Sequence, residues 1–182
     1  EVLRSREVFR NWLSAAIHYV FINPRALYRR SLNLMDVLGR GCINVNCRSG
    51  GKVCIDPALY GYVIYYYKRF IYNVQCDEKS NGLIINKSMV WRVYKGKYFE
   101  LDSAKFKRLY HSVIEVFLNQ DYSAVDVKDR VVVDVGAFVG DSAIYFVLRG
   151  AKKVYAIEPH PGAYQEMLEN IKLNNMEDRI VP

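Results

Sequence analysis

The sequence predicts an α/β protein in which a smaller mixed α/β region precedes the beginning of a doubly wound parallel sheet. Two observations support this fold class. In residues 130–181, apolar strand-like runs alternate with segments of helical periodicity, in the order strand, helix, strand, helix, strand. In residues 1–130, short strand patterns and turn signals are mixed with helical stripes, without an internal repeat. The 182 residues, 51% of them apolar, are enough for one domain with a sizeable core.

The N-terminal segment predicts two helices. Apolar residues recur at helical spacing over residues 2–20, and Pro24 ends this pattern because a proline disfavours helix in the residue before it. A second short helix is expected over residues 25–38, where Gly39 and Gly41 end it.

A β-hairpin and a helix are predicted next. Alternating apolar residues in 43–47, a Gly50-Gly51 turn and a second run at 53–55 are typical of a hairpin. Asp56-Pro57 is a helix start, with aspartate as the cap and proline in the first turn. The stripe of residues 60–71 favours a helix, although its β-branched and aromatic residues leave a strand as the alternative.

Three short strands then lead to another helix. Residues 83–85, 90–94 and 98–101 have strand patterns bounded by turn residues. Asp102 is placed to cap a following helix. The expected inner face of that helix consists of Phe106, Leu109, Tyr110, Val113 and Phe117.

The C-terminal segment carries the parallel-sheet pattern. The continuous apolar run of residues 131–133 predicts a strand buried on both faces, and a glycine-rich turn follows it. The elements expected after that turn are a helix over 143–148, a strand over 154–157, a helix over 163–174 and the start of a third strand at 179–181.

Charge and cysteine content limit the possible partners. With 26 Lys+Arg against 19 Asp+Glu, the formal net charge is +7, and the excess lies in residues 1–130. An acidic partner is therefore permitted, such as nucleic acid, a membrane surface or a phosphorylated metabolite. The four cysteines lack the spacing of a metal site, so we expect no metal. We expect buried, reduced thiols in a cytoplasmic protein; a disulfide between Cys47 and Cys54 is the alternative.

The turn after the first parallel strand carries the chemistry. Gly136 and Gly140 let the backbone bend sharply and approach a ligand, while the next helix offers free N–H groups to an anionic group. Glu158 ends the second strand, where a carboxylate can accept hydrogen bonds from both hydroxyls of a ribose. Together they predict a Rossmann-like pocket for an adenosine-bearing cofactor. The G-x-x-x-G spacing, with Asp134 before it, differs from the G-x-G-x-x-G of nicotinamide-dependent dehydrogenases.

The pattern D-x-G-x-x-x-G, followed by a strand that ends in glutamate, resembles the cofactor motifs of class I S-adenosylmethionine-dependent methyltransferases. The wider match, over residues 131–146, 150–161 and 170–180, resembles the FkbM family in particular. The resemblance implies S-adenosylmethionine as the cofactor, with Asp134 and the backbone of residues 136–140 at its methionine end. It also implies that Glu158 holds the ribose hydroxyls and that Asp141 caps the helix.

The same resemblance places Pro159 and His160 beside the adenine. The implied cofactor-binding residues are Asp134, Gly136, Ala137, Phe138, Gly140, Asp141, Glu158, Pro159 and His160. No residue is assigned as catalytic, because the cofactor is already activated and the enzyme needs in-line geometry and sometimes a base.

The function implied by this resemblance is O-methylation of a hydroxyl on a sugar or other small metabolite, and a nucleic acid substrate is not expected. The basic N-terminal helix allows a peripheral membrane contact. Residues 1–120 are predicted to form a basic accessory region, and residues 121–182 the first half of the cofactor-binding domain. Because the third strand has only begun at Pro182, we expect the chain to lack the C-terminal half of that domain.

Two alternatives stay open. The chain could be a non-catalytic basic binding or assembly module whose half-sheet is completed by another chain. It could also be a nicotinamide-dependent oxidoreductase, because the sheet topology is shared and a fold does not fix a function.

Overall fold

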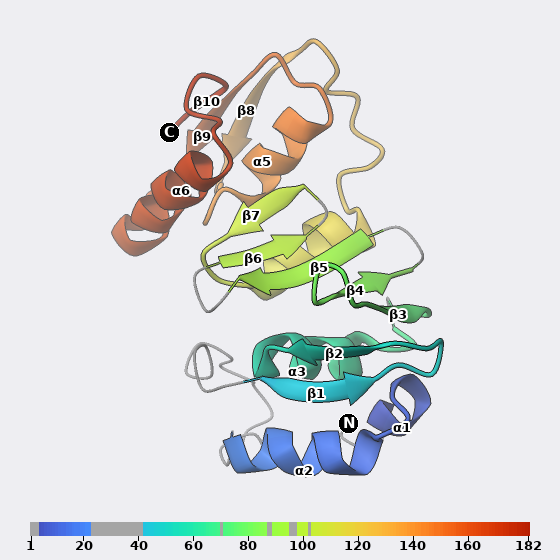
Figure 1. Cartoon of the computed structure of the whole chain (residues 1–182). Helices are drawn as coiled ribbons and strands as arrows, with labels where there is room; N and C mark the ends of the chain where they lie inside the picture. The colour runs from blue at the N-terminus through green and yellow to red at the C-terminus, as the bar shows by residue number, and fades with distance from the viewer. Residues whose placement is uncertain (1–3, 23–41, 70, 87–88, 95–97, 102) are drawn as a thin grey trace. The chain divides into compact units, whose positions relative to one another are not determined.

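Two compact units, Glu1–Asp102 and Ser103–Pro182, make up the chain in the computed structural model (Figure 1). The structure describes residues 4–22, 42–69, 71–86, 89–94, 98–101 and 103–182. The helix expected over residues 25–38 lies outside the described residues. The functional division into residues 1–120 and 121–182 stays a prediction. In the described part of the chain, no helix is long and apolar enough to cross a membrane.

Two helices, α1 (Ser5–Val8) and α2 (Trp12–Ile22), replace the single helix predicted over residues 2–20. Between them, Phe9 forms an antiparallel β-bridge with Cys47, and the Arg10 N–H donates to the Asn46 carbonyl at 2.7 Å. Backbone groups that pair with a strand edge cannot also serve a helix. The break is invisible in the sequence because the helical spacing of apolar residues continues across it.

The predicted hairpin and the helix after it are confirmed. The strands β1 (Ile43–Asn46) and β2 (Lys52–Ile55) pair antiparallel, and α3 (Pro57–Tyr66) follows. The Tyr60 N–H donates to the Asp56 carbonyl at 3.0 Å, which starts the helical ladder at the predicted position. Residues 60–66 are therefore helical, and the strand alternative is wrong for them.

The cysteines form two disulfides, Cys42–Cys54 and Cys47–Cys76, so the expectation of reduced thiols is wrong in this structure. The alternative pairing of Cys47 with Cys54 is not formed either. Side chains alternate between the faces of a strand, and Cys47 shares the buried face of Val45, whereas Cys54 lies on the face opposite to Val53. Each of the two thiols therefore pairs with a cysteine on its own side of the hairpin.

An antiparallel sheet completes the first unit. Its strands are β3 (Val74–Asp77), β4 (Gly82–Ile85), β5 (Met89–Tyr94) and β6 (Tyr98–Leu101), in that spatial order. The three strands predicted at 83–85, 90–94 and 98–101 are confirmed. The strand β3 was not predicted, because its four residues contain too few apolar side chains to form a strand pattern.

The second unit begins with elements that differ from the prediction. One helix was expected after Asp102, but the structure has β7 (Ala104–Phe106), α4 (His111–Ile114) and a π-helical turn (Glu115–Asn119). The Lys105 N–H donates to Asn174 Oδ1 at 2.8 Å, and the Lys105 carbonyl accepts from Asn174 Nδ2 at 2.7 Å. This side chain fixes the extended backbone, and local periodicity carries no sign of it. The expected cap, Asp102, lies outside the described residues.

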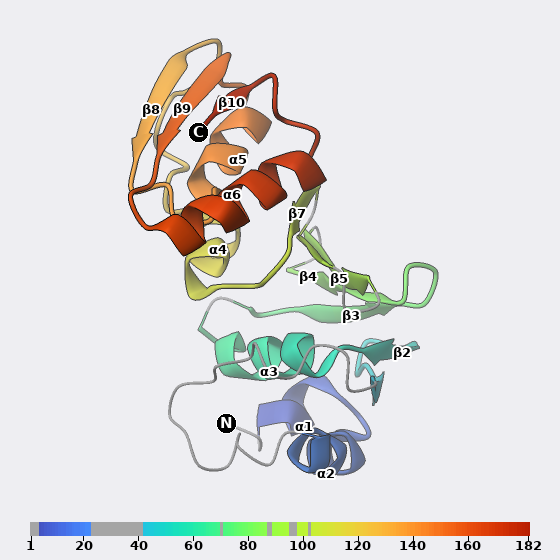
Figure 2. The ribbon, with the colours of Figure 1, turned by 90° about the vertical axis from the view of Figure 1, so that its left-hand side faces the viewer.

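The parallel-sheet pattern is confirmed. The remaining elements are β8 (Val131–Val135), α5 (Asp141–Leu148), β9 (Lys153–Ile157), α6 (Pro161–Leu173) and β10 (Ile180–Val181). The three strands are parallel in the order β10-β9-β8, with Val131 opposite Lys153 and Val135 opposite Ile157. Both helices lie on the same side of this sheet (Figure 2). The fold class is therefore α/β, as predicted.

One face of this sheet is bare. The side chains of Val154 and Ala156 are buried on the face that α5 and α6 cover. On the other face, the exposed fractions are 59% for Val131, 63% for Val133, 77% for Val135, 44% for Tyr155 and 52% for Ile157. The prediction that the first parallel strand is buried on both faces is wrong here, because the helices cover only one of them.

Candidate cofactor-binding site

The site is built around the turn that joins β8 to α5. Gly136 and Gly140 adopt φ values of 83° and 81°, and Phe138 adopts 47°, so the loop is held in a left-handed conformation at three positions. The N–H groups of Gly136 and Ala137 donate to the Ile157 carbonyl at 2.8 and 3.0 Å. These two hydrogen bonds hold the turn against the end of β9.

Gly140 meets two requirements at once. It is the N-cap of α5, and a Cβ atom there would lie 3.0 Å from Met167 Cγ of α6. A glycine therefore allows both the backbone angle and the close approach of the two helices. The expectation that Asp141 caps α5 is wrong, because Gly140 is the N-cap and Asp141 is the first residue inside the helix.

Glu158 connects the loop to the start of α6. Its Oε2 accepts from the Phe138 N–H at 2.8 Å, and its Oε1 accepts from the His160 N–H at 2.7 Å. A carboxylate has about four lone-pair directions, so each oxygen can accept one further hydrogen bond. The glutamate predicted to hold a ribose thus also holds the protein loop beside it.

Two aspartates lie beside the loop in poorly solvated positions. Burial raises the pKa of Asp134, although a hydrogen bond from Ser142 Oγ at 2.6 Å partly offsets this. Burial also raises the pKa of Asp141, which is only 3% exposed. Asp141 Oδ2 has no hydrogen-bond partner among the described residues. A buried carboxylate oxygen without a donor is suited to accept from a cationic ligand group.

His160 has a structural role in this geometry. It is the N-cap of α6, and its Nδ1 accepts from the Ala163 N–H at 3.2 Å. Both His160 and Pro159 are exposed, and Glu158 ties the His160 backbone to the loop. The structure therefore brings these two predicted residues next to the loop, while their contact with a ligand stays a prediction.

Three residues beside the loop were not predicted to belong to the site. The ring of Tyr110 lies edge-on to Phe138, with the ring centroids 5.0 Å apart. Glu166 Oε2 accepts from the Tyr110 hydroxyl at 2.9 Å and forms an ion pair with Arg108 at 3.2 Å. Burial raises the pKa of Tyr110, and the hydrogen bond to Tyr110 raises the pKa of Arg108. From the sequence, Tyr110 is expected on the inner face of a helix. Arg108 and Glu166 belong to no motif.

Asn170 of α6 joins the segment that contains Lys107, Arg108 and Tyr110 to the β8–α5 loop. Its side chain is completely buried, its Oδ1 accepts from the Lys107 N–H at 2.8 Å, and its Nδ2 donates to the Val139 carbonyl at 2.9 Å. Asn174, one turn later, holds both the N–H and the carbonyl of Lys105. Residues 105–107 are therefore fixed against the helix that also supports the loop.

These residues fit S-adenosylmethionine. The unpartnered oxygen of Asp141 suits the ammonium of the methionine end, the glycine turn gives close backbone access, and Glu158 retains lone pairs for ribose hydroxyls. The fold and the site define the cofactor-binding domain of a class I S-adenosylmethionine-dependent methyltransferase. The model of one particular family, the TRM5/TYW2 methyltransferase domain, matches residues 92–182, which is half of the chain. The chain belongs to this family.

Related proteins match the cofactor-binding segment. Ribosomal protein L11 methyltransferase of Carboxydothermus hydrogenoformans is 47% identical over 51 residues, which are 28% of this chain and 17% of that protein. The tRNA (guanine(37)-N(1))-methyltransferase Trm5b of Methanocaldococcus jannaschii is 46% identical over 52 residues, or 29% of this chain and 15% of that protein. The chain thus spans about a sixth of the length of these relatives. M. jannaschii TYW2 in complex with AdoMet has a TM-score of 0.36 and 27% identity, covering 55% of this chain and 46% of that one.

The comparisons correct two expectations. The resemblance to the FkbM family is wrong at the level of the family, since the matching model is that of TRM5/TYW2, although the class of methyltransferase is confirmed. The expectation of a small-molecule acceptor and no nucleic acid is contradicted by the similarity to a protein named as a tRNA methyltransferase. The misassignment has a simple cause, because the cofactor motif is shared by families that differ in their acceptors.

Proposed function

We propose that this chain carries the cofactor-binding part of an S-adenosylmethionine-dependent methyltransferase that acts on RNA. The observation that carries this proposal is the match of the TRM5/TYW2 family over the whole second unit, together with the intact loop and Glu158. The similarity to Trm5b and the net charge of +7 support RNA as the acceptor.

Each predicted residue has a role in this proposal. Asp134 and Asp141 face the ammonium of the cofactor, the backbone of residues 136–140 surrounds the methionine end, and Glu158 holds the ribose. Phe138, Pro159 and His160 line the adenine side. Bound S-adenosylmethionine supplies a methyl group already activated on a sulfonium. The protein therefore has to position the acceptor in line and exclude water.

The cofactor is tested by calorimetric titration of the purified chain with S-adenosylhomocysteine and, separately, with NAD. We expect saturable binding of S-adenosylhomocysteine only, at least tenfold weaker in Glu158→Gln because the amide nitrogen that replaces one oxygen can accept neither the backbone N–H nor a ribose hydroxyl. Glu177→Gln, an exposed acid of the same unit, is the matched control. Binding of NAD alone would support the oxidoreductase instead, and no binding by a folded chain would favour the non-catalytic module.

The acceptor is tested with S-adenosylmethionine labelled on its methyl group and a cell extract depleted of small molecules. Under this proposal the label enters material that ribonuclease destroys and protease spares. Because L11 methyltransferase is also similar, the opposite sensitivity is the result that would move the acceptor to a protein.

The cytoplasmic location expected from the sequence stays a prediction. The two disulfides are compatible with it in proteins of hyperthermophiles, where intracellular disulfides are common.

A further inference from the structure

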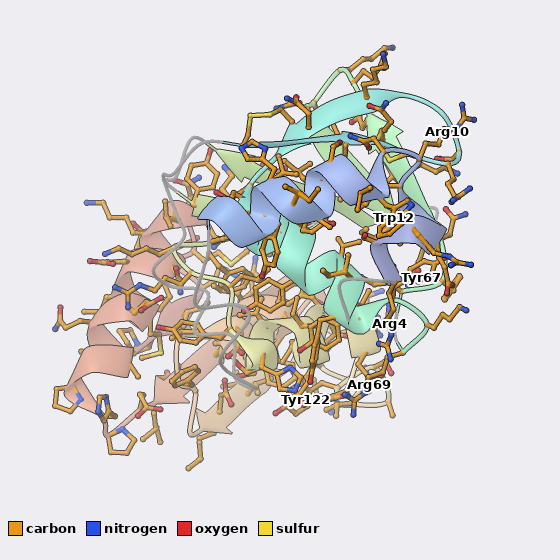
Figure 3. All side chains as sticks on the ribbon, turned by 90° about the horizontal axis from the view of Figure 1, so that it is seen from below. Arg4, Arg10, Trp12, Tyr67, Arg69 and Tyr122 are labelled. Carbon is orange, nitrogen blue, oxygen red and sulfur yellow. A yellow bond between two sulfur atoms is a disulfide. The ribbon has the colours of Figure 1, made fainter. Side chains whose placement is uncertain are left out.

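Exposed basic side chains from three separate segments meet in the first unit. We call them the basic surface: Arg4, Arg6, Arg10, Arg48, Lys68 and Arg69. Direct contacts hold the segments together, since the Arg48 N–H donates to the Val8 carbonyl at 3.1 Å and Lys68 pairs with Glu7 at 2.6 Å. Figure 3 shows Arg10, Arg4 and Arg69 along one side of the molecule seen from below.

The guanidinium groups of Arg4, Arg10 and Arg48 are held in place by backbone carbonyls. Arg48 Nε donates to the Arg6 carbonyl at 2.6 Å, Arg4 to the Tyr65 carbonyl at 3.3 Å, and Arg10 to the Arg48 carbonyl at 3.2 Å. A carbonyl fixes the orientation of a guanidinium but leaves its full charge. Glu7 is a carboxylate that meets this surface, through its ion pair with Lys68. The surface thus presents several oriented positive charges to an external anion.

Tyrosine rings accompany these charges. Tyr67 lies half-buried directly before Lys68, on the same side as Arg4 and Arg69 in Figure 3. Tyr72 directly follows Ile71, whose carbonyl accepts from the Lys68 N–H at 2.6 Å, and it is 72% exposed, although a ring of that size is usually covered. Arginine forks suit phosphate oxygens, and exposed rings can stack on unpaired bases.

We infer that the basic surface binds the sugar-phosphate backbone of an RNA, with Tyr72 stacking on an unpaired base. The choice of RNA rests on the function proposed above, whereas the surface rests on the contacts of the first unit. An anionic membrane is the competing partner, because Leu13 and Ile17 of α2 are 56% and 49% exposed. The observations favour RNA. A bilayer attracts basic residues by charge alone, whereas fixed guanidinium groups match individual phosphates and an exposed ring can stack on a base.

The test measures binding of the full chain to fluorescently labelled bulk tRNA by anisotropy at several salt concentrations. The variant Arg6→Ala/Arg10→Ala removes two charges. The control Lys152→Ala/Lys172→Ala removes two exposed charges from the second unit. We expect the first variant to bind at least tenfold more weakly, with a salt slope reduced by about 1.5, since each phosphate contact contributes about 0.7–0.9. The control should match the wild type, and circular dichroism verifies that all chains are folded.

Tyr72→Leu separates stacking from charge. It should weaken binding roughly fivefold or more with an unchanged salt slope, because stacking releases no counterions. The inference is overturned if wild-type chain does not bind tRNA, or if both double variants lose affinity equally. It is also overturned if the chain binds phosphatidylserine vesicles instead, with loss in Leu13→Ser/Ile17→Ser.

The S-adenosylhomocysteine titration keeps this inference distinct from the proposed function. A chain that binds tRNA through the basic surface but not the cofactor analogue would support the surface and overturn the enzyme. If the chain binds the analogue, but substitutions in the basic surface leave its tRNA affinity unchanged, the result would support the enzyme and overturn the surface.

Discussion

Asn170 shows how much one buried side chain can contribute to this site. Its amide pairs two backbone groups from different segments, the part-buried Lys107 N–H and the buried Val139 carbonyl, so Asn170→Ala leaves both of them unpaired. We expect a loss of about 2–6 kcal/mol in the free energy of unfolding, because each of the two orphaned groups costs roughly 1–3 kcal/mol. Urea denaturation measures this, with Gln165→Ala on the exposed side of the same helix as control. Equal stability of the two variants would contradict the bridging role.

The raised pKa of Asp141 predicts a pH dependence with a definite sign. A carboxyl whose pKa is higher in the folded than in the unfolded state costs stability once pH rises through that interval, because ionisation then favours unfolding. The variant Asp141→Asn cannot ionise. We expect it to be more stable than wild type at pH 7, with a difference that shrinks as pH falls toward the ordinary value of 3.8.

Thermal unfolding of both chains between pH 4 and 7 checks this sign. A difference that is constant over the range would mean that ionisation of Asp141 is not its origin. The same variant should bind S-adenosylhomocysteine less tightly, since it removes a charge from the proposed ammonium site.

The sequence predicted some of these residues and not others, for a physical reason. Asp134, Gly140 and Glu158 belong to a local pattern in which a strand end, a turn and a helix start follow one another. Asn170 and Glu166 act across 63 and 56 residues of chain, on partners whose position depends on the packed fold. Periodicity and spacing contain no information on such pairs.

At the scale of elements, the β8–α5 turn depends on two glycines that differ in surroundings. Both have positive φ, but a Cβ on Gly136 meets nothing within 4 Å, whereas a Cβ on Gly140 meets Met167 at 3.0 Å. Gly136→Ala should therefore cost about 1–2 kcal/mol, which is the penalty of the left-handed conformation alone. Gly140→Ala should cost at least about 1 kcal/mol more.

A double-mutant cycle with Met167→Ala isolates this contact. Urea denaturation measures the two single variants and the double variant. The double variant should lose less free energy of unfolding than the sum of the two single losses, by about 0.5 kcal/mol or more, because Met167→Ala removes the Cγ atom that a Cβ at position 140 would meet. No coupling would show that Gly140 is needed for its backbone angle only.

Element prediction succeeded where neighbours in sequence decide the structure and failed where distant ones do. The parallel strands and their helices follow from periods of 2 and 3.6 residues. The break between α1 and α2 comes from a bridge to Cys47, and the extended shape of β7 comes from Asn174. In both cases a partner in another segment overrides the local helical pattern.

At the scale of the whole molecule, the disulfides divide the chain into two parts of different sensitivity. All four cysteines lie in the first unit, and residues 103–182 contain none. Both tryptophans, Trp12 and Trp91, also lie in the first unit. A reducing agent should therefore lower the urea midpoint reported by tryptophan fluorescence, with a loss of about 2–4 kcal/mol in the free energy of unfolding for each disulfide lost.

The second unit supplies the internal control for this prediction. Its unfolding, followed by the far-ultraviolet signal that remains after the tryptophan transition, should not shift with reductant. A shift of both transitions together would show that the two units unfold as one.

The bare face of the parallel sheet is a second property of the molecule as a whole. Val133→Thr/Val135→Thr lies on the exposed face and should change stability by less than about 0.5 kcal/mol while reducing the binding of the dye ANS. Val154→Thr, on the buried face of the same sheet, should cost more than about 1 kcal/mol because it buries a hydroxyl. Dye binding that is unchanged in the double variant would place the apolar surface elsewhere.

Asn170 and Asn174 form hydrogen bonds to the backbone of residues 105–107. These bonds also limit how the length of this chain can vary. Positions four apart on a helix are separated by ~6 Å along its axis, and positions two apart on a strand by ~6.6 Å, so Asn170 and Asn174 match Lys107 and Lys105 in step. Inserting or deleting one residue in residues 105–107, or between Asn170 and Asn174, would put the two segments out of step, so that the bond of Asn170 to Lys107 and the two bonds of Asn174 to Lys105 could not form together. Homologues of this chain should therefore tolerate substitutions along this seam more readily than insertions or deletions, although part of the seam lies at the surface.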